Sequence, residues 1–306
     1  MAFIAGLNIN RKKVYMNKTL WGYLFIFPAI LGLLIFYLGP ILYSIAISFT
    51  RYNMLLPPKW IGIENYIRLF KDELVYKALS VTFYFVLLNV PTITIIPLLI
   101  AILLNTKVRY RSIFRTIFYI PSIVPAVANA AMWMYIFNPV FGFLNKIIGI
   151  FGIPPQQWIY DTKLVIPCFV LMSLWGAGNT VVIYLAGLQS ISKELYEAIE
   201  LDGGNAFSKF WNITLPMISP IIFYTVVMCT IGSLQVFTQA FIMTQGGPNN
   251  ASLFYMLLLY RTAFTNQEMG YACAMAWVMF VIIGILTIFI FKSAKMWVFY
   301  EVKQDV

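Results

Sequence analysis

The sequence predicts an all-α membrane protein built as a bundle of six transmembrane helices. Of its 306 residues, 61% are hydrophobic and only 10% are charged, whereas charged residues make up about a quarter of an ordinary soluble chain. The apolar residues form long continuous runs, and about 20 such residues span a bilayer as a helix. Because a backbone in lipid must satisfy its own hydrogen bonds, continuous rather than alternating runs predict helices and not a β-barrel.

Six apolar runs define the predicted spans and a single domain at residues 20–292, between tails at 1–19 and 293–306. The first run is too long for a signal peptide and no small-residue cleavage site follows it, so we expect a retained first helix. Proline pairs in the first three runs favour kinked helices: Pro28 and Pro40, Pro91 and Pro97, and Pro121 and Pro125. The six spans are predicted at residues 20–49, 77–104, 113–137, 164–188, 218–244 and 269–291.

The net charge of +10 is explained by membrane topology. Basic residues stand at the ends of the apolar runs, as the positive-inside rule expects, and form no block or helix face of the kind that binds nucleic acid. The excess lies on the side of both termini and of the 189–217 loop, which we therefore expect in the cytoplasm. That side holds Arg11, Lys12, Lys13, Lys18, Lys107, Arg109, Arg111, Arg115, Lys193, Lys209, Lys292, Lys295 and Lys303; the other holds Arg51, Lys59, Arg68, Lys71, Lys77, Lys146, Lys163 and Arg261.

Several kinds of chemistry are excluded or disfavoured. The three cysteines (Cys168, Cys229 and Cys273) lie in apolar runs without CxxC spacing, and histidine is absent, which argues against a disulfide framework or a metal site. All eleven carboxylates lie in loops, tails or span edges, whereas an ion-coupled carrier keeps ionisable groups inside the membrane. An embedded glycosyl or lipid transferase would need clustered carboxylates or histidines. No GxxxxGK[ST] loop is present, so we expect no ATP or other cofactor on this chain.

The polar 189–217 loop between the fourth and fifth spans predicts two short helices. Ser192 can cap a helix over 193–202, and Gly203-Gly204 supplies the left-handed residue that commonly ends one. A second helix is expected from Asn205, and Pro216 can stand near the start of the fifth span. Apolar side chains give the pair a large hydrophobic surface: Leu195, Ala198, Ile199 and Leu201 in the first helix, and Phe207, Phe210 and Trp211 in the second.

The loop carries Glu197-Ala198, then Gly203, then Ile213 and Leu215-Pro216. This order and spacing resemble the EAA loop of permease subunits of ABC importers, the segment that binds an ATPase subunit. Only the third position of the EAA word departs, with Ile199 in place of alanine. Farther on, 243–248 (MTQGGP), 260–264 (YRTAF) and 270–272 (GYA) resemble the sugar permeases of the maltose-uptake, F-type half. The resemblance implies ATPase-coupling roles for Glu197, Ala198, Asp202, Gly203, Ile213, Leu215 and Pro216.

What the family resemblance implies is a type I importer permease in the bacterial plasma (inner) membrane. Its expected partners are membrane lipid, a second homologous permease, two ATPases that carry ATP and Mg²⁺, and an extracytoplasmic solute-binding protein. The expected cargo is an oligosaccharide, imported by alternating access. The alternatives are a non-sugar solute such as a glycerol phosphate or a polyamine, or an ion-coupled carrier or channel that works without an ATPase.

Amides beside aromatic rings mark the candidate substrate path, because an amide can bond sugar hydroxyls while a ring covers the apolar sugar face. Such side chains recur four residues apart and so share a helix face. The competing interpretation is that these amides only join helices, at about 1 kcal/mol or less per hydrogen bond. Asn89 in the second span ranks below the candidates, which are Asn129 with Trp133, Trp175 with Asn179, and Gln235 with Gln239, continued by Tyr224 and Met228.

Overall fold

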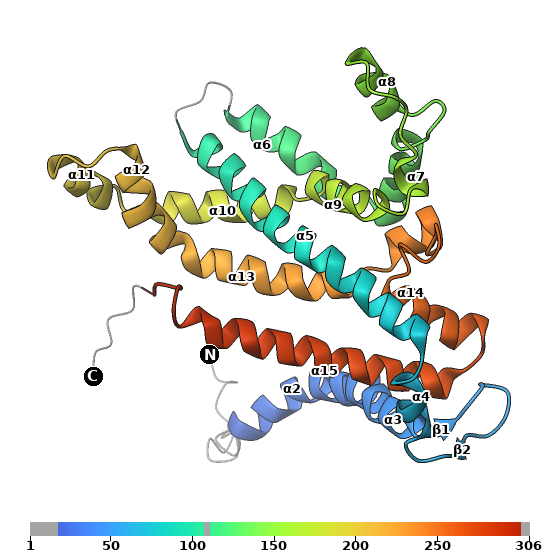
Figure 1. Ribbon diagram of the computed structural model, residues 1–306. Helices are drawn as coiled ribbons and strands as arrows, with labels where there is room; N and C mark the ends of the chain where they lie inside the picture. The colour runs from blue at the N-terminus through green and yellow to red at the C-terminus, as the bar shows by residue number, and fades with distance from the viewer. Residues whose placement is uncertain (1–17, 107–110, 301–306) are drawn as a thin grey trace, which may run out of the picture.

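The computed structural model describes residues 18–106 and 111–300, which form an elongated helical bundle (Figure 1). Four uninterrupted helices within the described ranges are long and apolar enough to cross a membrane: Trp21–Ser48, Glu73–Asn105, Ala206–Leu234 and Met269–Ala294. Two further candidates are bent pairs, Ser112–Ile123 with Ala126–Ile136 at 101° and Val165–Trp175 with Gly178–Ser190 at 50°. The six predicted spans therefore correspond to four continuous helices and two bent ones.

The helices follow the chain in this order. The first span comprises α2 (Lys18–Leu33), a π-helical turn η1 (Leu34–Leu38) and α3 (Gly39–Ser48), followed by the short strands β1 (Thr50–Arg51) and β2 (Lys59–Trp60) and by α4 (Glu64–Leu69). Then come α5 (Glu73–Asn105), α6 (Arg111–Tyr119), η2 (Ile120–Ile123), α7 (Ala126–Ile136), α8 (Phe143–Ile150), η3 (Trp158–Tyr160), α9 (Val165–Trp175) and α10 (Gly178–Ser190). The remainder are α11 (Lys193–Leu201), α12 (Ala206–Lys209), η4 (Phe210–Thr214), α13 (Leu215–Leu234), η5 (Ala240–Thr244), α14 (Tyr255–Tyr260), η6 (Arg261–Thr265) and α15 (Met269–Ala294).

Prolines interrupt only some of these helices. Pro121 lies in the 3₁₀ turn η2 and Pro125 is the residue before α7, so together they account for the sharp bend of the third span. Pro40 and Pro216 each lie two residues beyond a π-helical turn, which adds a residue to the turn before the proline. The fourth span bends at Gly176 and Ala177 without a proline.

The fifth span differs most from the prediction. Its helix starts at Ala206 inside the 189–217 loop and ends at Leu234, ten residues before the expected end at Thr244. The apolar run continues past that point because the segment through Ala240 and Met243 is itself buried in the core. An apolar run in the sequence predicts that the segment is buried, but it does not predict where the buried helix ends.

Helix α5 is the central element and packs against α9, α10, α13 and α14. Phe85 of α5 meets Phe254 edge-on at 5.3 Å between ring centroids, and Tyr255 donates its backbone N–H to the Thr82 hydroxyl at 2.9 Å. Where α6 crosses α10, Gly178 permits close approach, since a Cβ there would lie 2.2 Å from the Phe118 carbonyl oxygen. These contacts fix the helices that line the candidate site.

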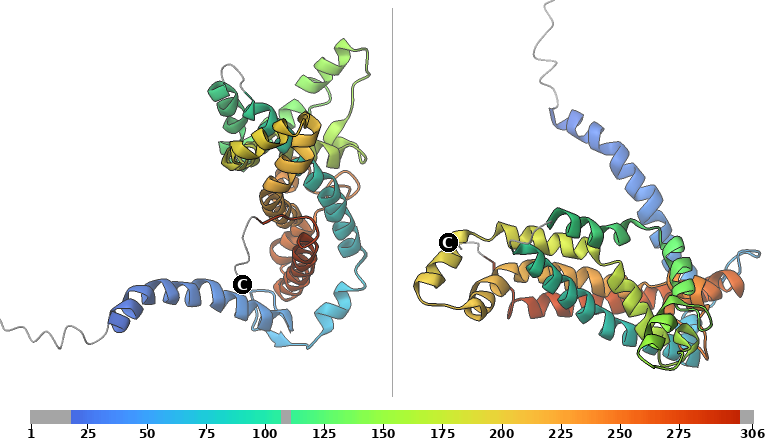
Figure 2. Two further views of the ribbon diagram at one scale, coloured as in Figure 1. Left: turned by 90° about the vertical axis from the view of Figure 1, so that its left-hand side faces the viewer. Right: turned by 90° about the horizontal axis from the view of Figure 1, so that it is seen from above.

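Helix α2 stands away from this bundle (Figure 2). None of the residues in the most apolar window of the first span is buried in the structure. The span joins the bundle through α3, which packs against α15; there the Trp277 indole N–H donates to the Ser44 hydroxyl at 3.1 Å. The apolar surface of α2 is therefore not covered by the other described parts of the chain.

Candidate functional site

The 189–217 loop protrudes from one end of the bundle as the helix pair α11 and α12 (Figure 1). The Ser192 side chain accepts the Glu194 N–H at 3.2 Å, which confirms the predicted cap, and α11 ends at Leu201, one residue earlier than expected. Gly203 has φ of +79°, and the N–H groups of Gly203 and Gly204 donate to Glu200 and Ile199 carbonyls at 3.0 and 2.8 Å. This pair of bonds is the Schellman motif, so the left-handed glycine follows the sequence prediction.

Side-chain contacts hold the two helices of the loop together. The Asn205 side chain accepts the Ser208 N–H at 2.9 Å and starts α12, which runs through η4 into α13 without a break. The Tyr196 and Thr214 hydroxyls are hydrogen-bonded at 3.0 Å. A salt bridge joins Glu200 to Lys209. The loop is therefore an ordered projection rather than a loose connection.

The outward surface of the loop is apolar and carries exposed carboxylates. Leu201 is 90% exposed, Phe207 71% and Trp211 51%, and the Phe207 and Trp211 ring centroids lie 5.9 Å apart. Glu197 is exposed and forms no salt bridge within the described ranges. Of the seven residues assigned to coupling by the resemblance, Glu197, Ala198, Asp202 and Gly203 are exposed, Leu215 and Pro216 are half-buried, and Ile213 is buried in a core cluster with α5 and α10.

A cleft of about 370 Å³ lies in the middle of the bundle, between α5, α13 and the bend that joins α9 to α10. Gly176 and Ala177, which form this bend, lie in its wall. All of its described lining residues are uncharged. The polar ones are Asn89, Ser173, Thr180, Tyr224, Thr225, Cys229, Ser233 and Gln239.

Asn89 lines this cleft and carries a buried polar atom without a hydrogen-bond partner. Its side-chain amide donates to the Ser233 hydroxyl at 2.9 Å, while its amide oxygen is buried without a hydrogen-bond partner. A buried acceptor without a partner costs about 1–3 kcal/mol. From the sequence, Asn89 ranked below the other candidates, and only the fold brings it opposite α13.

Two of the predicted path residues on the fifth span, Tyr224 and Gln239, line the cleft, together with Met228. Gln235 does not: it is exposed and ends α13, whereas Gln239 lies beyond the break. The expectation that Gln235 and Gln239 share a helix face is therefore wrong, because the helix that would align them stops at Leu234.

The other two pairs lie outside this cleft. Asn129 and Trp133 are one turn apart on α7, as expected, and the Asn129 amide oxygen and the Trp133 indole N–H are buried without partners. Trp175 and Asn179 fall on different helices on either side of the 50° bend, so they do not share one helix face as expected. Trp175 meets Trp133 edge-on at 6.0 Å between ring centroids, while Asn179 is exposed.

Apolar spans, a protruding ordered loop and a neutral polar cleft between bent helices together define a membrane-embedded transport subunit. The chain belongs to the family of inner membrane components of binding-protein-dependent transport systems, whose model matches residues 98–296. It is thus a multi-pass membrane protein, the permease subunit of an ABC importer; in such importers a solute-binding protein is a partner and other subunits hydrolyse ATP.

Curated relatives match nearly the whole chain. The probable ABC transporter permease protein YesP of Bacillus subtilis is 41% identical over 98% of this chain and 99% of its own length. The arabinooligosaccharides transport system permease protein AraP of the same species is 31% identical over 92% of this chain and 90% of its own length. A chain of the crystal structure of a bacterial alginate ABC transporter, in complex with an alginate pentasaccharide-bound periplasmic protein, shares the fold with a TM-score of 0.80 at 22% identity over 94% and 96% of the two chains.

Proposed function

We propose that this permease imports an oligosaccharide and that the cleft between α5, α10 and α13 is part of the sugar's route. The observation that carries the proposal is the neutral lining of the cleft, to which Tyr224 and Asn89, whose amide oxygen has no hydrogen-bond partner, both contribute. A hydroxyl-rich ligand suits such a wall. The relative AraP is named for the transport of arabinooligosaccharides, and the alginate transporter is bound to a periplasmic protein that holds an alginate pentasaccharide, so both support the same class of cargo.

The alternatives within the family fit this wall less well. A glycerol phosphate or a polyamine is charged, and a charged ligand in a low-dielectric site needs an opposite charge nearby. No ionisable carboxylate, lysine or arginine lines the described part of the cleft. An ion-coupled carrier is not favoured, because the family works with a binding protein.

The 189–217 loop is proposed as the contact with the ATPases, which carry ATP and Mg²⁺. Its apolar tip would enter a surface cleft of an ATPase, and Glu197 would pair with a basic residue there. The coupling residues are those of the resemblance: Glu197, Ala198, Asp202 and Gly203 on the exposed side, and Ile213, Leu215 and Pro216 where the loop joins the bundle. ATP-driven closure would then tilt the helices between inward-open and outward-open states.

This role requires the loop and both termini to be cytoplasmic, with one transmembrane domain at 20–292 and tails at 1–19 and 293–306. Seven of the thirteen basic residues that support this orientation are among the described residues. The other six lie outside them: Arg11, Lys12, Lys13, Lys107, Arg109 and Lys303. The exposed helix α2 supports a second permease as partner, because its apolar surface finds no cover in the described part of this chain. The solute-binding protein would bind at the opposite, outer end.

Reconstitution of the complete importer in vesicles tests both parts of the proposal. Glu197→Lys should abolish uptake and sugar-stimulated ATP hydrolysis, whereas the control Glu73→Lys, a charge reversal at the exposed start of α5, should leave both intact. Asn89→Leu should raise the KM for the sugar at least about tenfold, the effect of 1.4 kcal/mol. Normal stimulation in Glu197→Lys would contradict the coupling role, and an unchanged KM in Asn89→Leu would contradict the sugar site.

A further inference from the structure

Two prolines weaken the start of α13, between the 189–217 loop and the part of the helix that lines the cleft. Pro216 and Pro220 lie four residues apart. In an α-helix the N–H of residue 220 would donate to the carbonyl of residue 216, but proline has no N–H. The Pro216 carbonyl therefore needs another donor, and helices bend most readily at a proline.

Ser219 supplies that donor and makes a second hydrogen bond. Its hydroxyl donates to the Pro216 carbonyl at 2.6 Å, and its oxygen accepts the backbone N–H of Phe299 at 2.8 Å. Ser219 is buried, so the loss of its hydroxyl would leave both partners without ready access to water. One side chain thus repairs the proline position and attaches it to the far end of the chain.

The partner of Ser219 belongs to a short segment that follows α15 and lies at the same end of the bundle as the start of α13 (Figure 1). Backbone hydrogen bonds close this segment into a turn: the N–H groups of Trp297 and Val298 donate to the Ala294 carbonyl at 3.2 and 2.8 Å. Ala294 itself is buried. The segment is therefore an ordered extension of α15.

A second contact lies on the other side of Pro220. Phe223, one helical turn beyond Ser219, meets Phe291 edge-on at 4.9 Å between ring centroids, and it meets Trp297 at 6.1 Å. The contacts of Ser219 and Phe223 lie before and after Pro220 along α13. We call residues 291–299, which make both contacts, the C-terminal brace.

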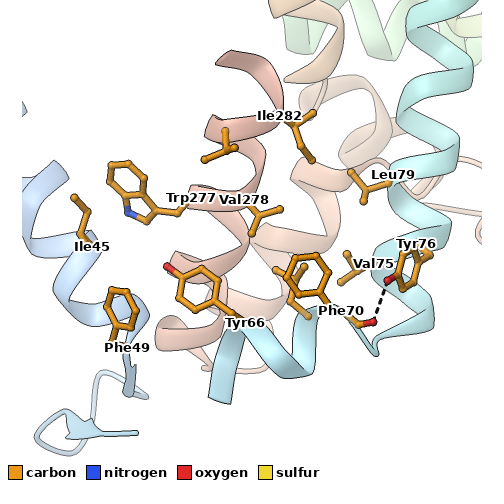
Figure 3. A pocket seen from close by; sticks show the side chains of 12 residues that line it. Ile45, Phe49, Tyr66, Phe70, Val75, Tyr76, Leu79, Trp277, Val278 and Ile282 are labelled. Carbon is orange, nitrogen blue, oxygen red and sulfur yellow. Dashed lines mark hydrogen bonds between the residues drawn. The ribbon is translucent and has the colours of Figure 1, made fainter. Parts of the chain in front are cut away.

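Helix α15 is also attached to the bundle near its start, so the brace is a separate attachment. There the Tyr255 hydroxyl donates to the Met275 carbonyl at 2.8 Å. Next to it, Val278 of α15 and Leu79 of α5 line an apolar cavity of about 500 Å³ (Figure 3). Because α15 is held at both ends, it can support α13 at the brace.

Pro220 lies between the two parts of α13 that the proposed function connects. The coupling residues end at Pro216, and the residues of α13 that line the cleft begin at Tyr224. If α13 bent at Pro220, a displacement of the 189–217 loop would be absorbed there and would not reach the cleft.

We propose that Ser219 is a positioning residue for transport. Through its bonds to Pro216 and Phe299 it keeps the proline-weakened turn rigid, so that the loop and the cleft wall move together. This role rests on the proposed ATPase contact of the loop and on the proposed sugar route through the cleft, whereas the rigidity of the turn depends on neither.

Hydrogen exchange of the complete purified importer measures this rigidity. In Ser219→Ala the amides of residues 221–224 should exchange at least about tenfold faster, the change that 1.4 kcal/mol of lost local stability causes. Ser219→Thr keeps a hydroxyl and should exchange like the natural chain. Phe299→Pro removes only the N–H donor and should also accelerate exchange, so the test survives if Ser219→Ala does not fold. Phe299→Ala keeps that N–H and should have no effect.

Ser44→Ala is the matched control. The Ser44 hydroxyl also donates to the carbonyl three residues earlier, at 2.7 Å, and it accepts the Trp277 indole N–H of α15 at 3.1 Å. Here the residue after the serine is Ile45, which keeps its N–H. Ser44→Ala should therefore leave exchange at residues 221–224 unchanged.

The number of sugar molecules imported per ATP hydrolysed, measured in vesicles, tests the role in transport. Ser219→Ala should lower this ratio without changing the KM for the sugar, because Ser219 does not line the described part of the cleft. Ser219→Thr and Ser44→Ala should keep the natural ratio.

The two measurements separate the possible outcomes. Natural exchange at residues 221–224 in both Ser219→Ala and Phe299→Pro would overturn the brace. Faster exchange with a natural ratio of sugar to ATP, or an equal loss of coupling in Ser44→Ala, would overturn the positioning role of Ser219. Absence of uptake by the natural chain would contradict the proposed function instead, and hydrogen exchange would still decide whether the brace exists.

Discussion

Substitution of Gly203 by alanine should loosen the end of α11 without a steric clash. Gly203 has φ of +79°, and a Cβ built there meets no atom within 4 Å, so the cost comes from the backbone alone. An L-residue in the left-handed region costs about 1–2 kcal/mol, and asparagine tolerates that region better than most. Because 1–2 kcal/mol changes a population by about 5- to 30-fold, Gly203→Ala should open the turn that much more often.

Hydrogen exchange measures this opening directly. The amides of residues 203 and 204 donate to the Glu200 and Ile199 carbonyls, so they exchange only when the turn opens. In Gly203→Ala their exchange should accelerate about 5- to 30-fold, whereas Gly203→Asn should remain close to the natural chain. Equal exchange in the alanine and asparagine variants would refute the backbone argument, since the two residues differ in how well they tolerate the left-handed region.

Three other predictions concern packing and stability. Gly178→Ala should destabilise the purified importer by about 1–3 kcal/mol through its clash with α6, seen as a lower thermal midpoint, while Gly284→Ala, with open space around it, should not. Asn145→Ala removes four hydrogen bonds, three of them to Gln156 and Trp158 in the segment after α8, and proteolysis there should become faster. The exposed Arg68–Glu268 salt bridge contributes roughly 0.2–1 kcal/mol to stability. Arg68→Lys should lose most of this contribution, because lysine cannot form the bidentate contact with the carboxylate.

Local chemistry explains why the 189–217 loop was predictable. Ser192, Gly203 and Asn205 act through bonds to residues within five positions along the chain, and such bonds depend little on the rest of the fold. The six spans were predictable for the similar reason that apolar length is a property of the sequence itself. Both predictions therefore concern features that a short window of residues contains.

The cleft could not be predicted in the same way, because it depends on where helices stop and bend. Nothing in the apolar run marks the end of α13 at Leu234, and this end places Gln239 in the cleft and Gln235 outside it. The bend at Gly176 likewise separates Trp175 from Asn179. Asn89 meets Ser233 across 144 residues of sequence, a distance over which helix periodicity carries no information.

One unbroken helix, Ala206–Leu234, begins in the 189–217 loop and ends at the cleft, so a tilt of this helix would move both. Ile213, buried near its start, divides it into arms of 7 and 21 residues, or about 10 and 30 Å at 1.5 Å per residue. A tilt about Ile213 would therefore move Ser233 about three times as far as Ala206. A small displacement of this helix at the loop would therefore produce a larger displacement of Ser233, which lines the cleft.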